Sequence, residues 1–439
     1  MNILVIGGGG REHALTHTFH RQGHRVYCIP GNAGTAKICQ PLPEKWAELD
    51  ANDYNSLAQF AKENSIDLTV VGPEAHLEAG IANIFNSKGL KIFGPNKQAA
   101  TLESSKSWSK EFMARHTIPT GAFVICHDSK SARQAIEEFF HAWGGVVIKP
   151  SGLTAGKGVV CCNTLEEAEQ AIREIMEDQR FGNAGSSIVI EQYLRGTEVS
   201  IHAFCDGNTI IPMLPAQDHK RLYDGGQGPN TGGIGAYTPT PFLDDATIAI
   251  VNEQIVQRTC IGLKKEGITF NGVIYFGLML TNEGPKVLEY NCRFGDPETQ
   301  VLLPLLESDL AEVMTASCNQ QLHNCHIHWK TDAACCVVMV SRGYPKNYTT
   351  GHAISGLQEA ERHDRIIVFH AGTAVNADGA AVSAGGRVLG ITGLGDTLEE
   401  AVQKAYEGVE LISFNGEYHR SDIAYRAYHR ATSDDLQPV

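Results

Sequence analysis

No apolar run in this sequence approaches the roughly 18 residues that a membrane-spanning helix needs, although the chain is 439 residues long. Basic charge is not in excess either, because 36 lysines and arginines stand against 50 aspartates and glutamates. The formal net charge of -14 and the lack of a long basic run argue against nucleic-acid binding. No basic leader precedes the first apolar segment, so we expect a β-strand there instead of a signal peptide, and a cytoplasmic protein without membrane contact.

Paired cysteine motifs are also absent. The 12 cysteines include no CxxC spacing, so neither a zinc ribbon nor a thioredoxin-type site is supported. Because they are scattered through a long chain, we expect buried, reduced thiols. The group His323, Cys325, His326 and His328 lacks a second paired half, and we interpret it as a polar connector, with zinc as the alternative.

The chain is long enough for about three domains of about 150 residues each. At its start, apolar segments at residues 3–6, 26–30, 68–71 and 91–93 alternate with helical patterns. This alternation predicts a parallel β-sheet with ligands at the carboxyl ends of its strands.

A glycine loop at residues 7–10 follows the first of these strands, as in dinucleotide-binding proteins. The GxGxxG fingerprint fails, because its third glycine falls on Glu12 or on His13, depending on the glycine counted first. This excludes a nicotinamide site. Small residues before a helix still allow its N-terminus to approach an anion, with a tight structural turn as the alternative.

A second glycine-rich stretch, residues 146–162, consists of two apolar segments around a loop. It is not a Walker A motif, because three residues instead of four separate Gly152 from Gly156, and a glycine follows Lys157. We predict a β-hairpin with a flexible tip that folds over phosphates. An ordinary surface hairpin is the alternative, although Lys149 lies in an apolar strand and therefore needs a partner.

Three further segments carry polar groups. A helix is predicted to begin near residue 105 with Lys106 in its first turn, where the helix dipole disfavours a cation unless an anion lies nearby. The apolar run at 187–194 ends in polar residues that could line a nucleotide pocket or simply continue a strand. The glycine-rich stretch 224–237 predicts a long structureless loop packed against a ligand.

Chemistry is most concentrated in residues 286–300. If residues 286–291 form a strand, Glu289 and Asn291 point to the same face, about 6–7 Å apart. A carboxylate and an amide oxygen suit a hard cation such as Mg²⁺, while a solvated strand end is the alternative. We also predict that Asp296 caps a helix beginning at Pro297, whose backbone N–H groups form an anion site.

The C-terminal part is rich in predicted strands, at residues 334–340, 365–370 and 386–392, and Thr397 begins a capping box for a final helix. We find no catalytic constellation there. Arg342 and Arg387 could reach a shared site, but surface ion pairs are the favoured interpretation.

Taken together and in order, the segments GGGGREHAL, PGNAGTA, KPSGLTAGKGV, QDHKR, GPNTGGIGAYTP and EYNCRFGDPETQ make the chain resemble the glycinamide ribonucleotide synthetase family of ATP-grasp ligases, nearly end to end. The resemblance implies an α/β ATP-grasp fold with an N-terminal parallel-sheet (pre-ATP-grasp, Rossmann-like) domain, a mobile cap subdomain and a C-terminal strand-rich α+β domain. The implied boundaries are residues 1–103, 104–325 with the cap at about 123–190, and 326–439.

The resemblance also implies an activity, which is ATP-dependent ligation of glycine to 5-phosphoribosylamine through glycyl phosphate in purine biosynthesis, with Mg²⁺ or Mn²⁺. It implies ATP binding by Lys106, Lys149, Ser151, Gly152, Gly156, Lys157, Gly158, Glu191, Gln192, Tyr193, Leu194 and Glu198. It implies metal binding by Glu289 and Asn291, and catalytic roles for Arg293, Asp296 and Glu298. Substrate binding is implied for Gly8, Gly9, Gly10, Arg11, Glu12, Asp218, Lys220, Asn230, Thr231, Gly232 and Gly233. We expect a monomer, with an oligomer left open.

The sequence departs from the family pattern at two points. Ser151 stands where the family usually has an acid, and the predicted strand at 273–280 lacks the carboxylate that many ATP-grasp enzymes use as a metal ligand. Two alternative functions remain, namely an ATP-grasp carboxylate–amine ligase with a different acceptor, and a non-catalytic nucleotide-binding regulator.

Overall fold

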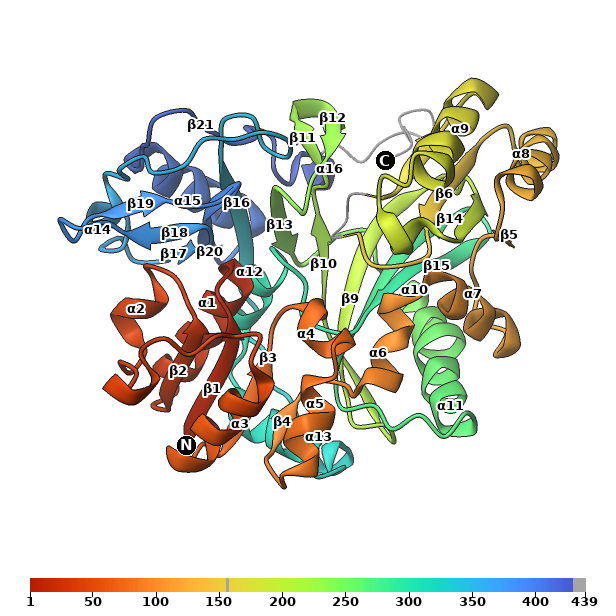
Figure 1. Cartoon of the computed structure of the whole chain (residues 1–439). Coiled ribbons are helices and arrows are strands. Elements are labelled where there is room, and N and C mark those ends of the chain that lie inside the picture. Colours follow the sequence, from red (N-terminus) through yellow and green to blue (C-terminus); the bar gives the residue numbers. More distant parts are fainter. Residues whose placement is uncertain (155–157, 429–439) are drawn as a thin grey trace.

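The computed structural model describes residues 1–154 and 158–428. The N-terminal region (red) lies beneath the strand-rich C-terminal region (blue), and a small cap with helices α8 (Ser129–Trp143) and α9 (Leu165–Ile172) lies across from both (Figure 1). In this part of the chain no helix has the length and apolarity to cross a membrane.

The N-terminal sheet is parallel, as the alternation of strands and helices predicted, with strand order β2-β1-β3-β4. Its strands are β1 (Asn2–Gly7), β2 (Arg25–Pro30), β3 (Leu68–Val71) and β4 (Ile92–Phe93). The helices of this region are α1 (Gly10–Arg21), α2 (Thr35–Ile38), α3 (Tyr54–Glu63), α4 (Glu74–Glu78) and α5 (Ile81–Ser87). Helix α4 follows the carboxyl end of β3, which is where a parallel sheet of this kind binds ligands.

Two helices, α6 (Lys97–Ser104) and α7 (Lys106–Arg115), lead out of this region. Ser105 separates them because it takes an extended conformation, and its side chain accepts a hydrogen bond from the backbone N–H of Trp108. This is the N-cap geometry expected of serine. The predicted helix start near residue 105, with Lys106 in the first turn, is confirmed.

The cap has an antiparallel sheet in the order β5-β8-β6-β7. Its strands are β5 (Phe123–Cys126), β6 (Val146–Pro150), β7 (Val160–Cys162) and β8 (Ile188–Gln192). The predicted hairpin is confirmed, since Val146 pairs with Cys162 and Ile148 with Val160. Apolar side chains of α8 and α9 pack on these strands in one small core.

The largest element is a nine-stranded antiparallel sheet in the order β15-β14-β9-β10-β13-β16-β20-β17, with β21 paired to β16. Its strands are β9 (Thr197–Cys205), β10 (Ile210–Asp218), β13 (Gly235–Thr238), β14 (Gly272–Thr281), β15 (Gly284–Asn291), β16 (Ala333–Ser341), β17 (Ile366–His370), β20 (Arg387–Gly395) and β21 (Glu417–Tyr418). The pairing of β13 with β16 joins the central part of the chain to its C-terminal part.

The remaining elements surround this sheet. They are β11 (Arg221–Tyr223), β12 (Gln227–Asn230), α10 (Asp245–Val251), α11 (Gln257–Lys265), α12 (Thr299–Leu302), α13 (Leu310–Cys318), α14 (Leu357–Ala360), β18 (Thr373–Val375), β19 (Ala381–Ser383), α15 (Leu398–Leu411) and α16 (Tyr425–Tyr428). Thr397 caps α15 as predicted.

Two local predictions are wrong. The stretch 224–237 is not a structureless loop, because β11 and β12 form a hairpin and β13 enters the large sheet. Its glycines instead supply the positive φ angles of the turn, at Gly225 and Gly226. Asp296 does not cap a helix, since α12 begins after Glu298 and the Asp296 carboxylate is bound elsewhere.

Candidate active site

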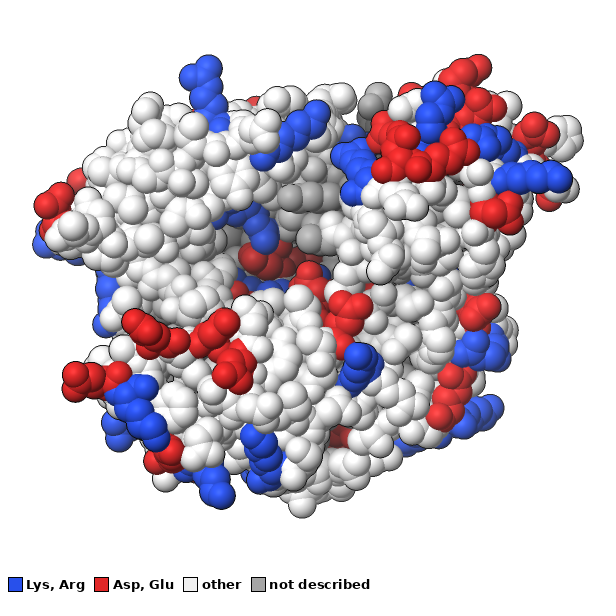
Figure 2. Space-filling view, viewed as in Figure 1, with Lys and Arg blue, Asp and Glu red and all other residues white. Residues whose placement is uncertain are grey.

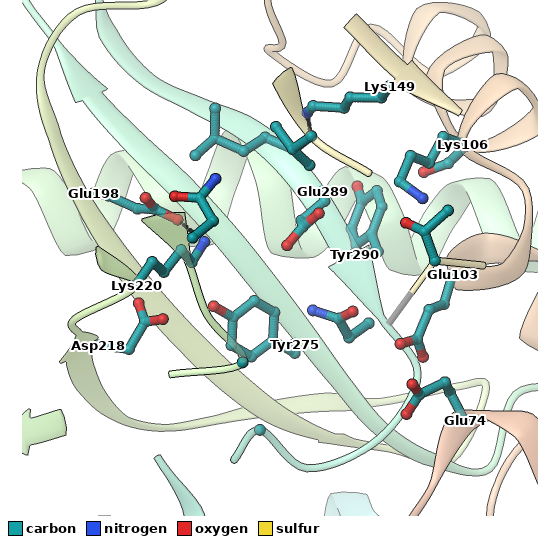
Figure 3. A pocket seen from close by; sticks show the side chains of 18 of the residues that line it. Glu74, Glu103, Lys106, Lys149, Glu198, Asp218, Lys220, Tyr275, Glu289 and Tyr290 are labelled. Carbon is teal, nitrogen blue, oxygen red and sulfur yellow. Dashed lines mark hydrogen bonds and ion pairs between the residues drawn. The ribbon is translucent and has the colours of Figure 1, made fainter. Parts of the chain in front are cut away.

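A cavity of about 460 Å³ lies where the N-terminal region, the cap sheet and the nine-stranded sheet meet. Figure 2 shows acidic and basic side chains gathered in the hollow at the centre of this face, and Figure 3 shows part of the set of side chains that line it. The predicted site residues among its lining are Arg11, Lys106, Lys149, Glu191, Gln192, Tyr193, Leu194, Glu198, Asp218, Lys220, Asn230, Thr231, Gly232, Glu289, Asn291, Arg293, Asp296 and Glu298.

Other predicted residues lie outside this lining. They are Gly8, Gly9, Gly10, Glu12, Ser151, Gly152, Gly158 and Gly233, while Gly156 and Lys157 fall outside the described residues. At the start of α1, the backbone N–H of Gly9 donates to the Glu12 carboxylate at 2.6 Å. The Glu12 carboxylate therefore already occupies part of the anion-binding site that we predicted at the N-terminus of α1.

Lys149 and Lys110 share one buried carboxylate, that of Glu191. The Lys149 Nζ lies 3.0 Å from Glu191 Oε1, and the Lys110 Nζ lies 2.7 Å from Glu191 Oε2. Burial alone would raise the pKa of Glu191, but the two lysines hold that pKa below its ordinary value. Burial would likewise lower the pKa of Lys149, and Glu191 and Glu289 raise it instead. Glu191 is therefore the partner that the internal Lys149 requires. Its carboxylate is directed at Lys149 and Lys110.

Glu289 and Asn291 face the cavity because β15 contains a β-bulge. Glu289 pairs with Gly277 while Val287 pairs with Leu278, so Leu288 is the extra residue. Beyond the bulge the alternation changes parity, and Glu289 and Asn291 line the cavity, which the largely buried Tyr290 also borders. The backbone carbonyl of Leu288 accepts a hydrogen bond from Lys149 at 3.3 Å.

The Glu289 carboxylate sits among cations. Burial would raise its pKa, but Lys220, Lys149 and Lys106 lower it below the ordinary value. It makes no hydrogen bond or ion pair with any other residue in the described part of the chain. Within residues 1–154 and 158–428, no group of three or more His, Cys, Asp or Glu side chains is arranged to hold a metal ion. A metal bound here would therefore rest on Glu289, the Asn291 amide oxygen and atoms supplied by a ligand.

Lys106 is anchored to the end of β6. Its backbone N–H donates to the Ser151 carbonyl at 2.8 Å and its Nζ donates to the Gly152 carbonyl at 3.1 Å. The Ser151 hydroxyl lies 2.8 Å from that of Ser107. Ser151 thus joins the cap strand to the first turn of α7. Here this position, at which the family pattern usually has an acid, has a structural role.

Arg293 is held between two acids of the preceding helices. Its Nε lies 3.2 Å from a Glu74 oxygen and one Nη lies 3.1 Å from a Glu103 oxygen. Burial raises the pKa of Glu103 to about 7 although Arg293 opposes the shift, whereas the pKa of Glu74 falls to about 2, because Arg293 and Arg11 overcome its burial. This clamp fixes the guanidinium beside Asn291 and ties the N-terminal region to the site.

Carboxylates dominate another part of the lining, where Asp218 and Glu198 lie beside Lys220 and Tyr275 (Figure 3). Glu298 also lines the cavity, and its charge raises the pKa values of Asp218 and Tyr275. Lys220 is paired with Glu198. Burial raises the pKa of Asp218 to about 8, with Lys220 opposing and Glu298 and Glu198 adding to the shift. Burial also raises the pKa of Glu298. Like charges in one buried space cannot all ionise at their ordinary pKa.

Arg387 of the C-terminal region reaches into the same cavity. It donates to the carbonyls of Gly232 and Asp296 at 2.5 and 2.6 Å, and it lies 2.7 Å from the Asp296 carboxylate. The hydroxyl of Tyr344 accepts from the backbone N–H of Gly232 at 2.9 Å. The favoured interpretation of Arg387 as part of a surface ion pair is wrong, because its partner, Asp296, also lines the cavity.

Sequence reasoning missed Lys110, Glu74 and Glu103, and it considered Arg387 for a shared site but favoured a surface ion pair. A signal existed for Lys110, since it lies one helical turn after Lys106 and the two therefore share a helix face. A weaker signal existed for Glu74, which follows the carboxyl end of a parallel strand. Glu103 and Arg387 reach the cavity through packing between distant segments, and their local sequence carries no sign of it.

Three family models match the chain in order. The model for the N domain of phosphoribosylglycinamide synthetase matches residues 1–103, that for its ATP-grasp (A) domain matches residues 104–299, and that for its C domain matches residues 334–426.

Curated relatives cover nearly all of the chain. A phosphoribosylamine–glycine ligase of Caldanaerobacter subterraneus is 44% identical over 426 residues, which are 97% of this chain and 99% of that protein. The trifunctional purine biosynthetic protein adenosine-3 of Gallus gallus is 48% identical over 431 residues. The match covers 97% of this chain but 42% of that protein, so the chain spans less than half of the trifunctional relative.

Solved structures agree with these matches. A phosphoribosylamine–glycine ligase from Thermotoga maritima superposes with a TM-score of 0.80 at 33% identity and covers 97% of this chain and 100% of its own. A biotin carboxylase from Campylobacter jejuni superposes with a TM-score of 0.71 at 13% identity, covering 98% of each chain. The second likeness concerns the fold alone.

Proposed function

The chain belongs to the phosphoribosylglycinamide synthetase family, and from that premise we propose that it is a phosphoribosylamine–glycine ligase. In the proposed reaction a glycine carboxylate oxygen takes the γ-phosphoryl group of ATP, which gives glycyl phosphate and ADP. The amine of 5-phosphoribosylamine then attacks the glycyl carbonyl, loses a proton and displaces phosphate. The product is glycinamide ribonucleotide, an intermediate of purine biosynthesis.

The observation that carries the proposal is the position of Glu289, a half-buried carboxylate at the cavity wall among the lysines that lower its pKa. Those lysines come from α7, from β6 and from the segment after β10, so three separate elements converge on one point. Phosphoryl transfer depends mainly on positioning and on neutralising charge, and it needs no protein nucleophile.

ATP binding is assigned to the part of the cavity under the cap. Lys106 and Lys149 would contact its phosphates, and residues 192–194 would meet adenine beside apolar lining from the cap and from β15. The Glu191 side chain serves differently from its neighbours, because it holds Lys149 and Lys110 in place. Ribose binding by Glu198 would share that carboxylate with Lys220. Gly156 and Lys157 keep their proposed role in the loop over the phosphates.

Metal binding is assigned to Glu289 and Asn291, with Mg²⁺ or Mn²⁺ as the ion. The donor set fits, because the Glu289 carboxylate is anionic and makes no hydrogen bond or ion pair within the described residues, and Asn291 offers an amide oxygen whose contact with Arg293, at 3.4 Å, is long. When bound, the ion would neutralise charge on the transferring phosphoryl group. Lys106 and Lys149 perform the same task from the other elements that line the cavity.

Substrate binding is assigned to the carboxylate-rich part of the cavity and its borders. Arg293, Asp296 and Glu298 would surround the glycine that is activated, with Asp218 and Lys220 beside them. Residues 230–233 and the start of α1, residues 8–12, would border the sugar phosphate. Arg387 belongs with this group through its contacts with Gly232 and Asp296.

The remaining proposals concern organisation. We divide the chain into residues 1–103, 104–325 with the cap at about 123–190, and 326–439, and we place it in the cytoplasm as a monomer that acts on small molecules. One experiment tests the function, namely ADP release measured with ATP, glycine and 5-phosphoribosylamine together and then with each omitted. Release should require both glycine and the amine. If another acid or amine replaced them, a ligase with a different acceptor would be favoured, and if no ADP formed, a regulator would be.

A further inference from the structure

A short C-terminal segment, residues 417–428, is attached to a hairpin that borders the cavity. At its centre lies Arg420, which is only 1% exposed and is among the largest fully buried side chains in the described part of the chain. Arg420 is absent from the cavity lining, and no role in the proposed reaction accounts for burying its charge. A buried arginine is costly unless its donors are matched, so its partners show what it holds.

Arg420 makes a two-point ion pair and one backbone contact. Its Nε and one Nη lie 2.7 and 2.8 Å from the two carboxylate oxygens of Asp422. The other Nη donates to the carbonyl of Arg221, the first residue of β11, at 3.0 Å. The Asp422 carboxylate in turn accepts from the backbone N–H of Gly225, in the turn of the hairpin, at 2.7 Å. The Arg420–Asp422 ion pair thus contacts the β11–β12 hairpin at two places, namely its first residue, Arg221, and its turn, at Gly225.

Neighbouring residues strengthen the same attachment. Ser421 donates its backbone N–H to the Asp224 carboxylate at 3.0 Å, and its hydroxyl also contacts that carboxylate. The backbone N–H of Ala424 donates to the ring of His219 at 3.3 Å. The segment is itself secured to α15, because the Tyr406 hydroxyl donates to the Arg420 carbonyl at 2.8 Å.

The hairpin leads directly into the cavity. Arg221 follows Lys220, whose carbonyl accepts from both the backbone N–H and the hydroxyl of Thr231, at 2.7 and 2.8 Å. Lys220, Asn230 and Thr231 all line the cavity. A displacement of β11 relative to the C-terminal region would therefore move the Lys220 ammonium and the 230–233 loop together.

We propose that Arg420 is a positioning residue, which acts through Asp422 and the β11–β12 hairpin to hold Lys220 and the 230–233 loop in place. The inference rests on the proposed function only for the identity of the substrate at that loop. It assigns to the C-terminal segment a part in binding 5-phosphoribosylamine, although none of residues 417–428 lines the cavity. Among the described residues, neither the cap nor Lys106, Lys110 or Lys149 makes a hydrogen bond or ion pair with Arg420, so ATP binding should depend on Arg420 less than amine binding does, through the Lys220–Glu198 pair alone.

The test compares Arg420→Gln, Arg420→Lys and Ser421→Ala with wild type in the full chain. Arg420→Gln should raise the KM for 5-phosphoribosylamine about tenfold or more, because small misplacements of binding groups have large effects, while the KM for ATP stays within about twofold. Arg420→Lys should recover part of the loss, since lysine keeps the charge but not the two-point geometry. Ser421→Ala, at an exposed contact, should show a smaller rise in the same constant. Arg365→Gln is the matched control, because it breaks an exposed 2.7 Å ion pair with Asp396 far from the hairpin in sequence.

A second measurement keeps the inference separate from the proposed function. Hydrogen exchange should speed up at the amides of β11 and β12 in Arg420→Gln but not at those of β14 and β15. If exchange at the hairpin is unchanged, or if the KM values for ATP and the amine rise equally, the inference is overturned. If wild type shows no turnover with 5-phosphoribosylamine, the proposed function fails, and the exchange result alone then decides whether Arg420 positions the hairpin.

Discussion

Two parts of one cavity differ in charge. Beneath the cap, Lys106, Lys110 and Lys149 stand with Glu191 and Glu289, and both carboxyls have pKa values below their ordinary range. Farther along, Asp218, Glu198 and Glu298 stand with Lys220, and the pKa values of Asp218 and Glu298 are raised. Burial acts on both groups alike, so the balance of neighbouring charge decides the direction of each shift.

The difference matches the charges of the proposed substrates. ATP phosphates are anionic and need cations in place before they arrive. Glycine carries an ammonium group, and the attacking amine releases a proton, so carboxylates suit the second part. Glu289 lies between the two parts, because lysines of both lower its pKa. The charge pattern therefore favours the proposed placement of ATP beneath the cap and of glycine and the amine in the carboxylate-rich part.

Of the changes considered, removing the Glu289 carboxylate should have the largest effect on activity. Glu289→Ala deletes the carboxylate that separates the lysines and serves as the proposed metal ligand, so we expect metal-dependent ADP formation to fall about 1,000-fold or more. Glu289→Gln keeps the shape and removes the charge, and it should lose nearly as much. Turnover is measured at saturating Mg²⁺, with circular dichroism to confirm the fold. Near-normal turnover in Glu289→Ala would refute the metal assignment.

Removing Lys149 should weaken one part of the cavity and spare the other. Lys149→Ala is expected to lower ATP affinity and to slow glycyl phosphate formation about 100-fold, because a buried phosphate contact is lost and Glu191 keeps only Lys110. The KM for 5-phosphoribosylamine should change little. Calorimetric ATP binding and single-turnover kinetics measure the two effects, with the exposed Lys45→Ala as control. Unchanged nucleotide affinity and rate would contradict the assignment.

The smallest expected effect concerns stability in the carboxylate-rich part. Asp218 has a pKa of about 8 in the folded protein, against about 3.9 in an unfolded chain. Between these values the folded state keeps a proton that the unfolded state has released, so the free energy of unfolding falls as pH rises from about 4 to about 8. Asp218→Asn cannot titrate, and its melting temperature should exceed that of wild type by a few degrees at pH 8. The advantage should shrink towards pH 5, and a difference independent of pH would contradict the shift.

Local sequence patterns predicted the elements that depend on local physics. The serine cap before Lys106, the hairpin at 146–162 and the Thr397 helix cap are confirmed because each depends on residues a few positions apart. The full capping box at Thr397 does not form, since the Glu400 carboxylate accepts from the backbone N–H of Asp396 instead of that of Thr397. The parallel N-terminal sheet follows from regular alternation in the same way. That Glu289 and Asn291 share one face needs only the period of a strand, whereas the bulge at Leu288 turns that face towards the cavity.

Predictions failed where distant segments compete with local preference. Asp296 has the sequence context of a helix cap, but Arg387 and Gln300 bind its carboxylate. The glycines of residues 224–237 suggest a structureless loop packed against a ligand, yet the C-terminal segment and β16 hold that stretch in hairpin and sheet. Burial of Glu103 against Arg293 likewise arises from packing that no short window of sequence contains.

The nine-stranded sheet sets a limit on how the molecule can be divided. Strand β13 belongs to the central part of the chain and β16 to the C-terminal part, and they pair from Gly235 with Val337 to Thr238 with Ala334. A cut between the two parts would open the middle of a sheet and leave two unpaired edges, each a template for aggregation. The last hundred residues are therefore no detachable module. They complete the sheet on which the carboxylate-rich part of the cavity is built. A chain shortened before β16 should therefore aggregate, and this loss of solubility should precede any selective loss of substrate binding.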